Sequence, residues 1–294
     1  MKRILVTGIN GQLGQELSAI LPSVGEVIGV GRAELDLTET EAICQVINQV
    51  KPDIIVNAAA YTAVDKAESE PELAEAINAI APGTIAAECE KLAIPLIHIS
   101  TDYVFDGSQS SPYQETDKTN PLSVYGKSKL AGEIAIQNNC KNYIILRTAW
   151  VYGVGGKGNF VKTMLRLGKE RKEIRVVADQ IGSPTCTLDL ANTITQLIPL
   201  FQPEITGIYN FTNSGVASWY DFAVAIFEEA KLLGWDLQLE RVIPITTPEY
   251  PTPACRPAYS VLACGKISTV LGTFPPHWRQ GLRKMLTELF KTTL

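Results

Sequence analysis

Short apolar runs alternate with longer amphipathic segments through the first half of the chain. The apolar runs are rich in Ile and Val, which is typical of strands buried on both faces of a parallel sheet. They lie at residues 3–7, 27–30, 52–56 and 95–99. This alternation continues to about Trp150. It predicts an α/β fold of the Rossmann type, with a doubly wound parallel sheet.

Further elements follow from the same patterns. Helices are predicted at 73–92, 124–137, 159–168 and 219–233, and strands at 174–177 and 208–211. Polar, turn-rich residues predict loops at 108–120 and 179–185. The segment 243–257 has prolines at 244, 248, 251, 253 and 257, so we expect a stiff loop with no helix or strand.

The first strand is followed by three glycines and then by a helical pattern. Gly8, Gly11 and Gly14 have the spacing G-x-x-G-x-x-G. Between a strand and a helix, such a turn brings backbone N–H groups and the helix dipole to a pyrophosphate. An ordinary glycine-rich turn would show the same pattern. Its place at the start of the chain favours a dinucleotide site.

The end of the second strand bears on which nicotinamide cofactor binds. Gly31 stands where a carboxylate would hold the 2′-hydroxyl of NADH, and Arg32 follows it. A guanidinium without a carboxylate favours the 2′-phosphate of NADPH, although NADH remains possible. Asp36 either meets the adenine amino group or caps the next helix.

A tyrosine and a lysine four residues apart supply the candidate chemistry. Tyr125 and Lys129 share one face of a helix, where an ammonium would lower the pKa of a phenol. Thr101 follows the strand at 95–99 and can hydrogen-bond an oxyanion. The alternative is a solvated helix face. Ala59 and Ala60, after the strand at 52–56, are small enough for a cofactor to lie against them.

Composition narrows the class of protein. The formal charge of −5 without a basic run argues against a nucleic-acid partner, and no apolar run is long enough to span a membrane. Six cysteines form no Cys-x-x-Cys pair, so we expect reduced thiols and a cytoplasmic enzyme. We interpret His98, inside a strand, as a core residue.

The length of 294 residues allows two lobes. We expect a dinucleotide-binding domain at 1–152 and a smaller C-terminal α/β substrate lobe at 153–294. The strands at 174–177 and 208–211 are expected to return to the first sheet.

Longer motifs carry a resemblance to a known family. They are residues 57–71 (NAAAYTAVDKAESEP), 100–107 (STDYVFDG), 120–129 (NPLSVYGKSK), 147–152 (RTAWVY), 159–164 (NFVKTM), 179–185 (DQIGSPT), 250–257 (YPTPACRP) and 285–288 (MLTE). The chain resembles the extended short-chain dehydrogenase/reductase superfamily and, within it, the dTDP-4-dehydrorhamnose reductase family. The similarity covers essentially the whole chain.

The resemblance implies reduction of a 4-keto nucleotide sugar by NAD(P)H, the last step of dTDP-L-rhamnose synthesis. Tyr125 would protonate the sugar oxygen, Lys129 would hold the nicotinamide ribose, and Thr101 would bond the substrate oxygen. Asp102 and Trp150 would contact the sugar. Gly11, Gln12, Leu13, Asp36, Leu37, Ala60, Tyr61 and Thr62 would line the cofactor.

Other expectations concern the anionic substrate, a metal and assembly. Arg256, with Lys157 and Lys162, is a candidate for binding the substrate pyrophosphate. Some relatives hold Mg²⁺ through glutamates at a subunit contact. Glu16 and Glu288 match that set, but the third place falls near Leu188, beside Asp189, so we expect no metal. The helices at 73–92 and 124–137 often form a dimer interface in relatives, so a homodimer is possible.

Two other functions stay open. A non-catalytic NADP-binding regulatory subunit would use the same scaffold. A nucleotide-sugar epimerase or dehydratase is the second alternative, but Tyr103 stands where superfamily dehydratases carry a glutamate.

Overall fold

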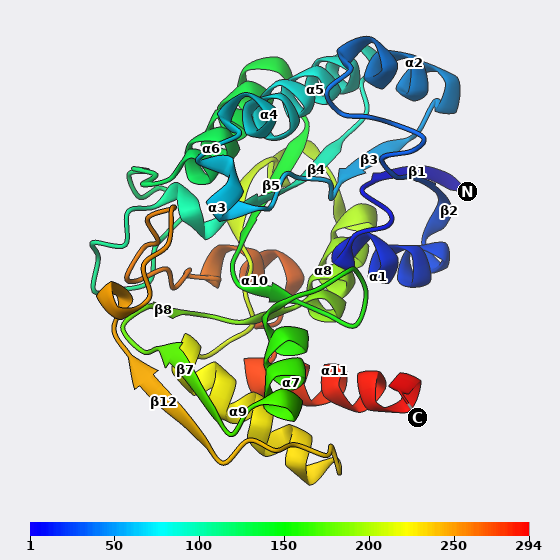
Figure 1. The fold of residues 1–294 in the computed structure, drawn as a ribbon. Helices are drawn as coiled ribbons and strands as arrows, with labels where there is room; N and C mark the ends of the chain where they lie inside the picture. Colours follow the sequence, from blue (N-terminus) through cyan, green and yellow to red (C-terminus); the bar gives the residue numbers. More distant parts are fainter. Residues whose placement is uncertain (294) are drawn as a thin grey trace.

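A parallel six-stranded sheet forms the centre of the first domain. In this computed structural model, which describes residues 1–293, the strand order is β10-β5-β4-β3-β1-β2 (Figure 1). The strands are β1 (Lys2–Thr7), β2 (Gly25–Val30), β3 (Ile54–Asn57), β4 (Leu96–Thr101), β5 (Tyr143–Thr148) and β10 (Gly207–Asn210). The chain places β2 on one side of β1 and β3 on the other, so the direction of strand addition reverses between β1 and β3. Open α/β sheets bind ligands at such a point. The predicted α/β fold is confirmed.

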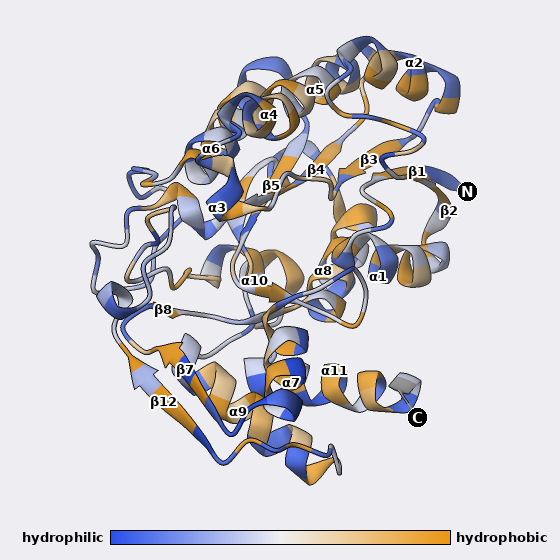
Figure 2. Ribbon diagram, viewed as in Figure 1, coloured by the Kyte–Doolittle hydropathy of each residue, from blue (hydrophilic) through white to orange (hydrophobic). Residues whose placement is uncertain are grey.

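Helices cover both faces of this sheet (Figure 1). One face carries α1 (Gln12–Ile20), α8 (Thr187–Leu200) and α10 (Gly265–Leu271), and the other carries α2 (Thr40–Val50), α5 (Ala81–Leu92) and α6 (Val124–Asn139). Along β1, Ile4 and Val6 pack in the first layer and Leu5 in the second. β3, which is buried on both faces, is therefore apolar up to Asn57, as Figure 2 shows, whereas β4 also carries His98, Ser100 and Thr101.

A second hydrophobic core lies in the C-terminal lobe. Its main elements are α7 (Phe160–Glu170), α9 (Trp219–Leu232), α11 (Trp278–Thr293), β7 (Glu173–Val177) and β12 (Arg241–Ile245). β10 lies at the edge of the six-stranded sheet, but β7 pairs with β12 outside it. The expectation that 174–177 returns to the first sheet is therefore wrong. β7 buries alternate residues, which suits a sheet covered on one face only.

The proline-rich segment also differs from its prediction. Pro244 lies inside β12, and Thr247–Glu249 forms a 3₁₀ turn, η5. The expectation of a segment without regular structure is wrong at these residues. β12 has a partner on one side only, so Pro244 needs no N–H for a second neighbour.

The predicted helix at 73–92 contains a π turn. It consists of α4 (Pro71–Glu75), η2 (Ala76–Ile80) and α5 without interruption. A Cβ at Gly132 of α6 would lie 2.0 Å from the carbonyl oxygen of Asn78, so the two helices approach closely at this turn. The remaining short elements are η1 (Leu21–Ser23), α3 (Val64–Ala67), η3 (Asp102–Val104), β6 (Val151–Tyr152), β8 (Ile181–Gly182), β9 (Thr185–Cys186), η4 (Pro203–Ile205) and β11 (Ala217–Ser218).

Candidate active site

The glycine turn has the geometry that a pyrophosphate needs. Gly8 has φ +73°, and a Cβ there would lie 2.8 Å from backbone atoms of Ala59. A Cβ at Gly14 would lie 2.2 Å from the Gly8 carbonyl oxygen, so only glycine lets α1 approach the turn. Gly11 caps α1 without a side chain, which leaves the helix N-terminus accessible to an anion. These residues fit a dinucleotide.

Arg32 and Asp36 lie beyond the end of β2. The Arg32 side chain is 79% exposed and its Nε lies 3.6 Å from Asp36 Oδ2. Asp36 accepts hydrogen bonds from the backbone and hydroxyl of Thr38, which lower its pKa. Glu39, not Asp36, is the N-cap of α2, so the capping alternative for Asp36 is wrong.

The predicted cofactor-lining segment after β3 is attached to the π turn. The amide of Tyr61 donates to Asn78 Oδ1 at 2.9 Å, and Asn78 Nδ2 donates to the Tyr61 carbonyl at 3.0 Å. Asn78 also donates to Ser128 of α6 at 3.1 Å. Ala59 and Ala60 are half-buried, and Thr62 is exposed. Asn78 was not among the predicted site residues, because nothing in a regular helical pattern marks a residue that bonds across elements.

Tyr125, Thr101 and Asp102 meet at the ends of β4 and α6. Ser123 caps α6 by accepting from the Gly126 amide at 3.1 Å, which sets Tyr125 in the first turn. Burial raises the pKa of Tyr125 to about 12, the charge of Asp102 acts in the same direction, and a hydrogen bond with Thr101 opposes them. The phenol is therefore protonated at neutral pH.

Asp102 has a buried carboxylate oxygen without a partner. Its side chain is 2% exposed, Oδ1 accepts from Thr101 Oγ1 at 3.1 Å, and Oδ2 has no hydrogen-bond partner among the described residues. Burial raises the pKa of Asp102 to about 6, and hydrogen bonding with Ser260 and Thr101 opposes this rise. A buried acceptor that no protein donor satisfies is where a ligand hydroxyl would bind.

Lys129 follows Tyr125 by four residues on α6, and its side chain bonds to β4. Its Nζ donates to the Ile99 carbonyl at 2.6 Å and lies 3.2 Å from His98 Nε2. Burial lowers the pKa of Lys129 to about 8. The expected lowering of the Tyr125 pKa by Lys129 is not found, because burial dominates both groups. His98 is fully buried, as predicted for a core residue, but it also contacts Lys129.

Trp150 packs in the aromatic cluster of the C-terminal lobe. It has φ +48°, which is rare for a residue with a side chain. Its indole stacks on Trp219 with ring centroids 3.6 Å apart. Gly182 lies against it, since a Cβ there would be 2.6 Å from the indole. The stack gives the lobe a rigid aromatic surface.

Arg256 has a protein partner. Its guanidinium binds both carboxylate oxygens of Asp65 in α3, at 3.0 and 2.7 Å, and donates to the Ala254 carbonyl at 3.2 Å. The pair joins the proline-rich segment to the first domain. Both side chains are partly exposed, Arg256 at 21% and Asp65 at 41%.

The other predicted cations and the first turn of α1 meet at the loop 153–158. Lys162 donates to the carbonyls of Val154, Gly155 and Gly156, and burial lowers its pKa. Asn159 donates to Gln12 Oε1 at 2.7 Å. The loop therefore packs against the glycine turn.

Three other predicted site residues lie in the hydrophobic core or on the surface. Leu13 and Leu37 are buried in the two core layers of the first domain, 7% and 8% exposed. Lys157 is exposed.

The acidic residues considered for a metal do not gather. The Glu16 pKa is raised by burial and, in part, by the charge of Glu288, while Asp189 accepts from Asn213 at 2.8 Å. Within residues 1–293, no three His, Cys, Asp or Glu side chains form a group that would hold a metal ion. Within the same range, no helix is long and apolar enough to cross a bilayer.

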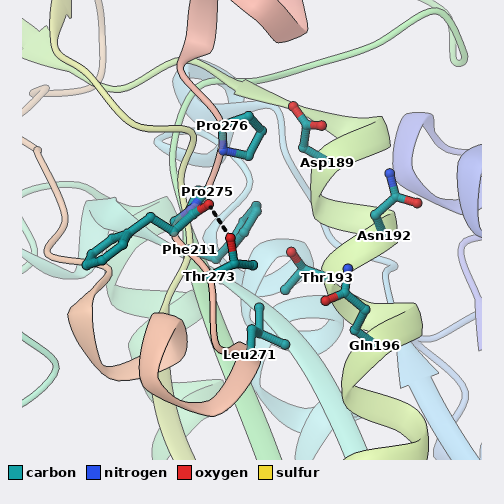
Figure 3. Close-up of a pocket in the computed structure, with 10 residues that line it drawn as sticks. Asp189, Asn192, Thr193, Gln196, Phe211, Leu271, Thr273, Pro275 and Pro276 are labelled. Carbon is teal, nitrogen blue, oxygen red and sulfur yellow. Dashed lines mark hydrogen bonds between the residues drawn. The ribbon is translucent and has the colours of Figure 1, made fainter.

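A separate cavity of about 210 Å³ lies between α8 and the segment after α10 (Figure 3). Its wall from α8 is polar, with Asp189, Asn192 and Gln196, and the opposite wall includes Pro275 and Pro276. None of the predicted catalytic, cofactor or substrate residues lines it. The cavity is small for an organic ligand, and it is not the candidate active site.

Comparisons with known proteins agree on one family. Residues 1–291 match the family model described as RmlD substrate binding domain. The chain is 45% identical over 297 residues to the dTDP-4-dehydrorhamnose reductase of Salmonella typhimurium, with 99% of each chain covered. The Bacillus anthracis dTDP-4-dehydrorhamnose reductase, solved in complex with NADP, is 40% identical with a TM-score of 0.91, covering 98% of this chain and 99% of that one. A Clostridium acetobutylicum dTDP-4-dehydrorhamnose reductase structure is 42% identical, also with a TM-score of 0.91 and the same coverage.

Proposed function

The chain belongs to the RmlD substrate binding domain family, and from this we propose that it reduces dTDP-4-dehydro-L-rhamnose to dTDP-L-rhamnose with NADPH. It is an oxidoreductase of dTDP-rhamnose biosynthesis, like the curated relatives that it matches over nearly their whole length. The similar Bacillus anthracis structure contains NADP, which supports NADPH as the cofactor.

The residues of the first domain fit that cofactor. The helix N-terminus at Gly11 would receive the pyrophosphate, and Arg32 would meet the 2′-phosphate. Residues 59–62 would lie along the nicotinamide half, with Asn78 fixing their backbone. When bound, NADPH supplies the hydride that reaches the 4-keto carbon of the sugar.

The protein groups supply the proton and hold the sugar. Tyr125 donates its phenolic proton to the carbonyl oxygen, which becomes the product hydroxyl, and Thr101 hydrogen-bonds the same oxygen. Asp102 Oδ2 accepts from a sugar hydroxyl. Lys129 holds the nicotinamide ribose. Its positive charge stabilises the phenolate that Tyr125 becomes after it donates its proton. Trp150 forms the apolar wall of the sugar site.

The observation that carries this proposal is the pairing of a protonated phenol with an unpaired buried carboxylate oxygen. Tyr125 offers a donor and Asp102 an acceptor in one buried site, which matches a sugar with a carbonyl next to a hydroxyl. A dehydratase would need a further base, and Tyr103 stands at the position considered for it. A regulatory subunit would not need this pairing.

The direct test is an assay with freshly generated 4-keto nucleotide sugar. We expect nicotinamide absorbance to fall with NADPH and dTDP-L-rhamnose to form in equal amount. Binding of NADPH without turnover would support the regulatory alternative. Product with an unreduced keto group would support the epimerase alternative.

We also propose a homodimer and a cytoplasmic location. Ile80 of η2 and Ile134 of α6 are 51% and 49% exposed on helical segments that pack together, which supports a partner on that face. The cysteines are free, including Cys89 and Cys140, which lie close enough to interact, and this supports a reducing compartment.

A further inference from the structure

A buried line of polar side chains runs across three neighbouring strands to Lys129. Thr7 Oγ1 of β1 donates to Asn57 Oδ1 of β3 at 2.6 Å. Asn57 Nδ2 lies 3.0 Å from His98 Nδ1 of β4, and His98 Nε2 lies 3.2 Å from Lys129 Nζ. All four side chains are at most 2% exposed, so water does not replace these contacts.

The direction of the line is fixed at Asn57. Its Oδ1 accepts from the Thr7 hydroxyl and also from the backbone N–H of Ala59 at 3.3 Å. A backbone N–H can only donate, so the amide oxygen must lie on that side. The amide nitrogen of Asn57 therefore donates to His98 Nδ1.

This direction determines the tautomer of His98. Burial, with the charge of Lys129, lowers the pKa of His98 well below its ordinary value, so the ring is neutral. Since Nδ1 accepts a hydrogen bond, the single ring proton is on Nε2. That N–H points at Lys129 Nζ, which donates to the Ile99 carbonyl on another side.

We propose that His98 is a positioning residue whose Nε2–H donates to the neutral amine of Lys129 and disfavours its ammonium form at that place. A neutral amine has a lone pair that accepts the bond, whereas an ammonium has only donors and would face a second donor. Protonation of Lys129 thus releases its nitrogen from His98. The inference rests on the role proposed above for Lys129.

Other charged groups around Lys129 allow both forms. Glu133, one turn along α6, favours the ammonium, but Arg147 of β5 binds that carboxylate at 2.7 Å and Ser100 of β4 also donates to it. Tyr125, one turn back along α6, is a protonated phenol at neutral pH. Because burial brings the pKa of Lys129 to about 8, neutral and charged forms both exist between neutral and mildly alkaline pH.

Histidine NMR on the cofactor-free protein tests the contact directly. The chain has two histidines, so ¹⁵N-histidine labelling gives two ring systems, and His277→Gln assigns them. We expect His98 to be neutral with its proton on Nε2. Its resonance should shift with pH around a midpoint near 8, and Lys129→Met should remove this shift. A proton on Nδ1, or the same pH response without Lys129, would overturn the proposal.

A pair of variants tests the consequence for reduction. His98→Gln keeps an N–H donor near the Nε2 position, whereas His98→Phe keeps only the ring. We expect His98→Phe to move the pH dependence of kcat/KM by about one pH unit to the alkaline side, because the ammonium of Lys129 no longer faces a donor, and His98→Gln to keep the wild-type pH dependence. A loss of kcat/KM in both variants without a change in its pH dependence would mean that His98 only packs. The NMR result needs no turnover, so an error in the proposed reaction would not be mistaken for an error here.

Discussion

The protonation state of Tyr125 follows from its place at the start of a buried helix. With a pKa of about 12, the phenol keeps its proton throughout the neutral range, as a donor in a reduction must. Tyr125→Phe removes the proton and leaves the ring. We expect kcat/KM to fall about 10³-fold, with the NADPH dissociation constant unchanged. Tyr113→Phe, which removes another buried phenol, is the control; full turnover by the Tyr125→Phe variant would refute the assignment.

Asp102 should set the acidic limb of the pH dependence of kcat/KM. Its pKa of about 6 means that the carboxylate is ionised above pH 6 and loses its acceptor charge below it. We expect kcat/KM to fall as the pH drops through 6. Asp102→Asn should lower activity and abolish this limb, measured as kcat/KM from pH 5 to 9. A limb that persists in the Asn variant belongs to another group.

The same carboxylate should cost stability. A pKa raised on folding means that the folded state prefers the protonated form, so the penalty is absent at low pH and grows as the pH rises from the ordinary value of 3.8 to about 6. We expect Asp102→Asn to stabilise the protein at pH 8 by about 3 kcal/mol and to have little effect at pH 4, in urea unfolding.

Arg32 is predicted to distinguish the cofactors. Its exposed side chain has only a loose contact with Asp36, so it is free to turn to a 2′-phosphate. We expect Arg32→Ala to raise the NADPH dissociation constant about tenfold and to leave that of NADH unchanged, by fluorescence titration. Arg166→Ala, at another exposed arginine, is the control. An equal rise in the dissociation constants of NADPH and NADH would mean that Arg32 does not bind the 2′-phosphate.

At the residue scale, the sequence predicts the groups that carry chemistry better than the groups that hold them. Thr101 and Tyr125 stand in recognisable motifs and do meet in the structure. Asn78 and His98 act through partners far apart in the chain, and no local pattern marks such contacts. The expected effect of Lys129 on Tyr125 also failed, because spacing gives proximity but not burial.

At the element scale, the proline-rich segment is joined to α3 by Asp65 and Arg256. If the guanidinium acts only through this pair, Asp65→Ala and Arg256→Ala should lower kcat/KM equally, and the double variant should be no worse than either. Stability should change by about 1 kcal/mol or less, because both side chains are partly exposed. Additive losses in the double-variant cycle would mean that Arg256 contacts the substrate itself.

The sequence predicts the ends of helices and strands closely where local patterns decide them. It does not predict which strands pair. The helix predicted at 124–137 is α6, with Ser123 as its cap. The partner of β7 depends on which edge of which sheet is available, and a strand of five residues carries no such information. The prediction at Pro244 was wrong because proline excludes a central strand but not an edge strand, and the sequence does not show which of these a strand becomes.

At the scale of the whole molecule, the chain crosses between the lobes several times. α8, β10 and α10 lie beyond residue 152 and still pack on the first sheet, so the two cores are not successive in sequence. The crossings place Trp150 and Arg256 at the lobe boundary, on segments that leave or reach the sheet. A site built from such segments requires both lobes to fold together.

The proposed dimer is tested at the exposed face of α6. Ile134→Glu would place a charge in an apolar contact between copies, so we expect the wild type to sediment as a dimer and this variant as a monomer. Ile134 is 49% exposed in one chain, so thermal unfolding of the monomer should reflect only the lost interface. Leu232→Glu, at a residue of α9 that is 81% exposed, should remain dimeric. A monomeric wild type, or dissociation by Leu232→Glu alone, would place the interface elsewhere or remove it.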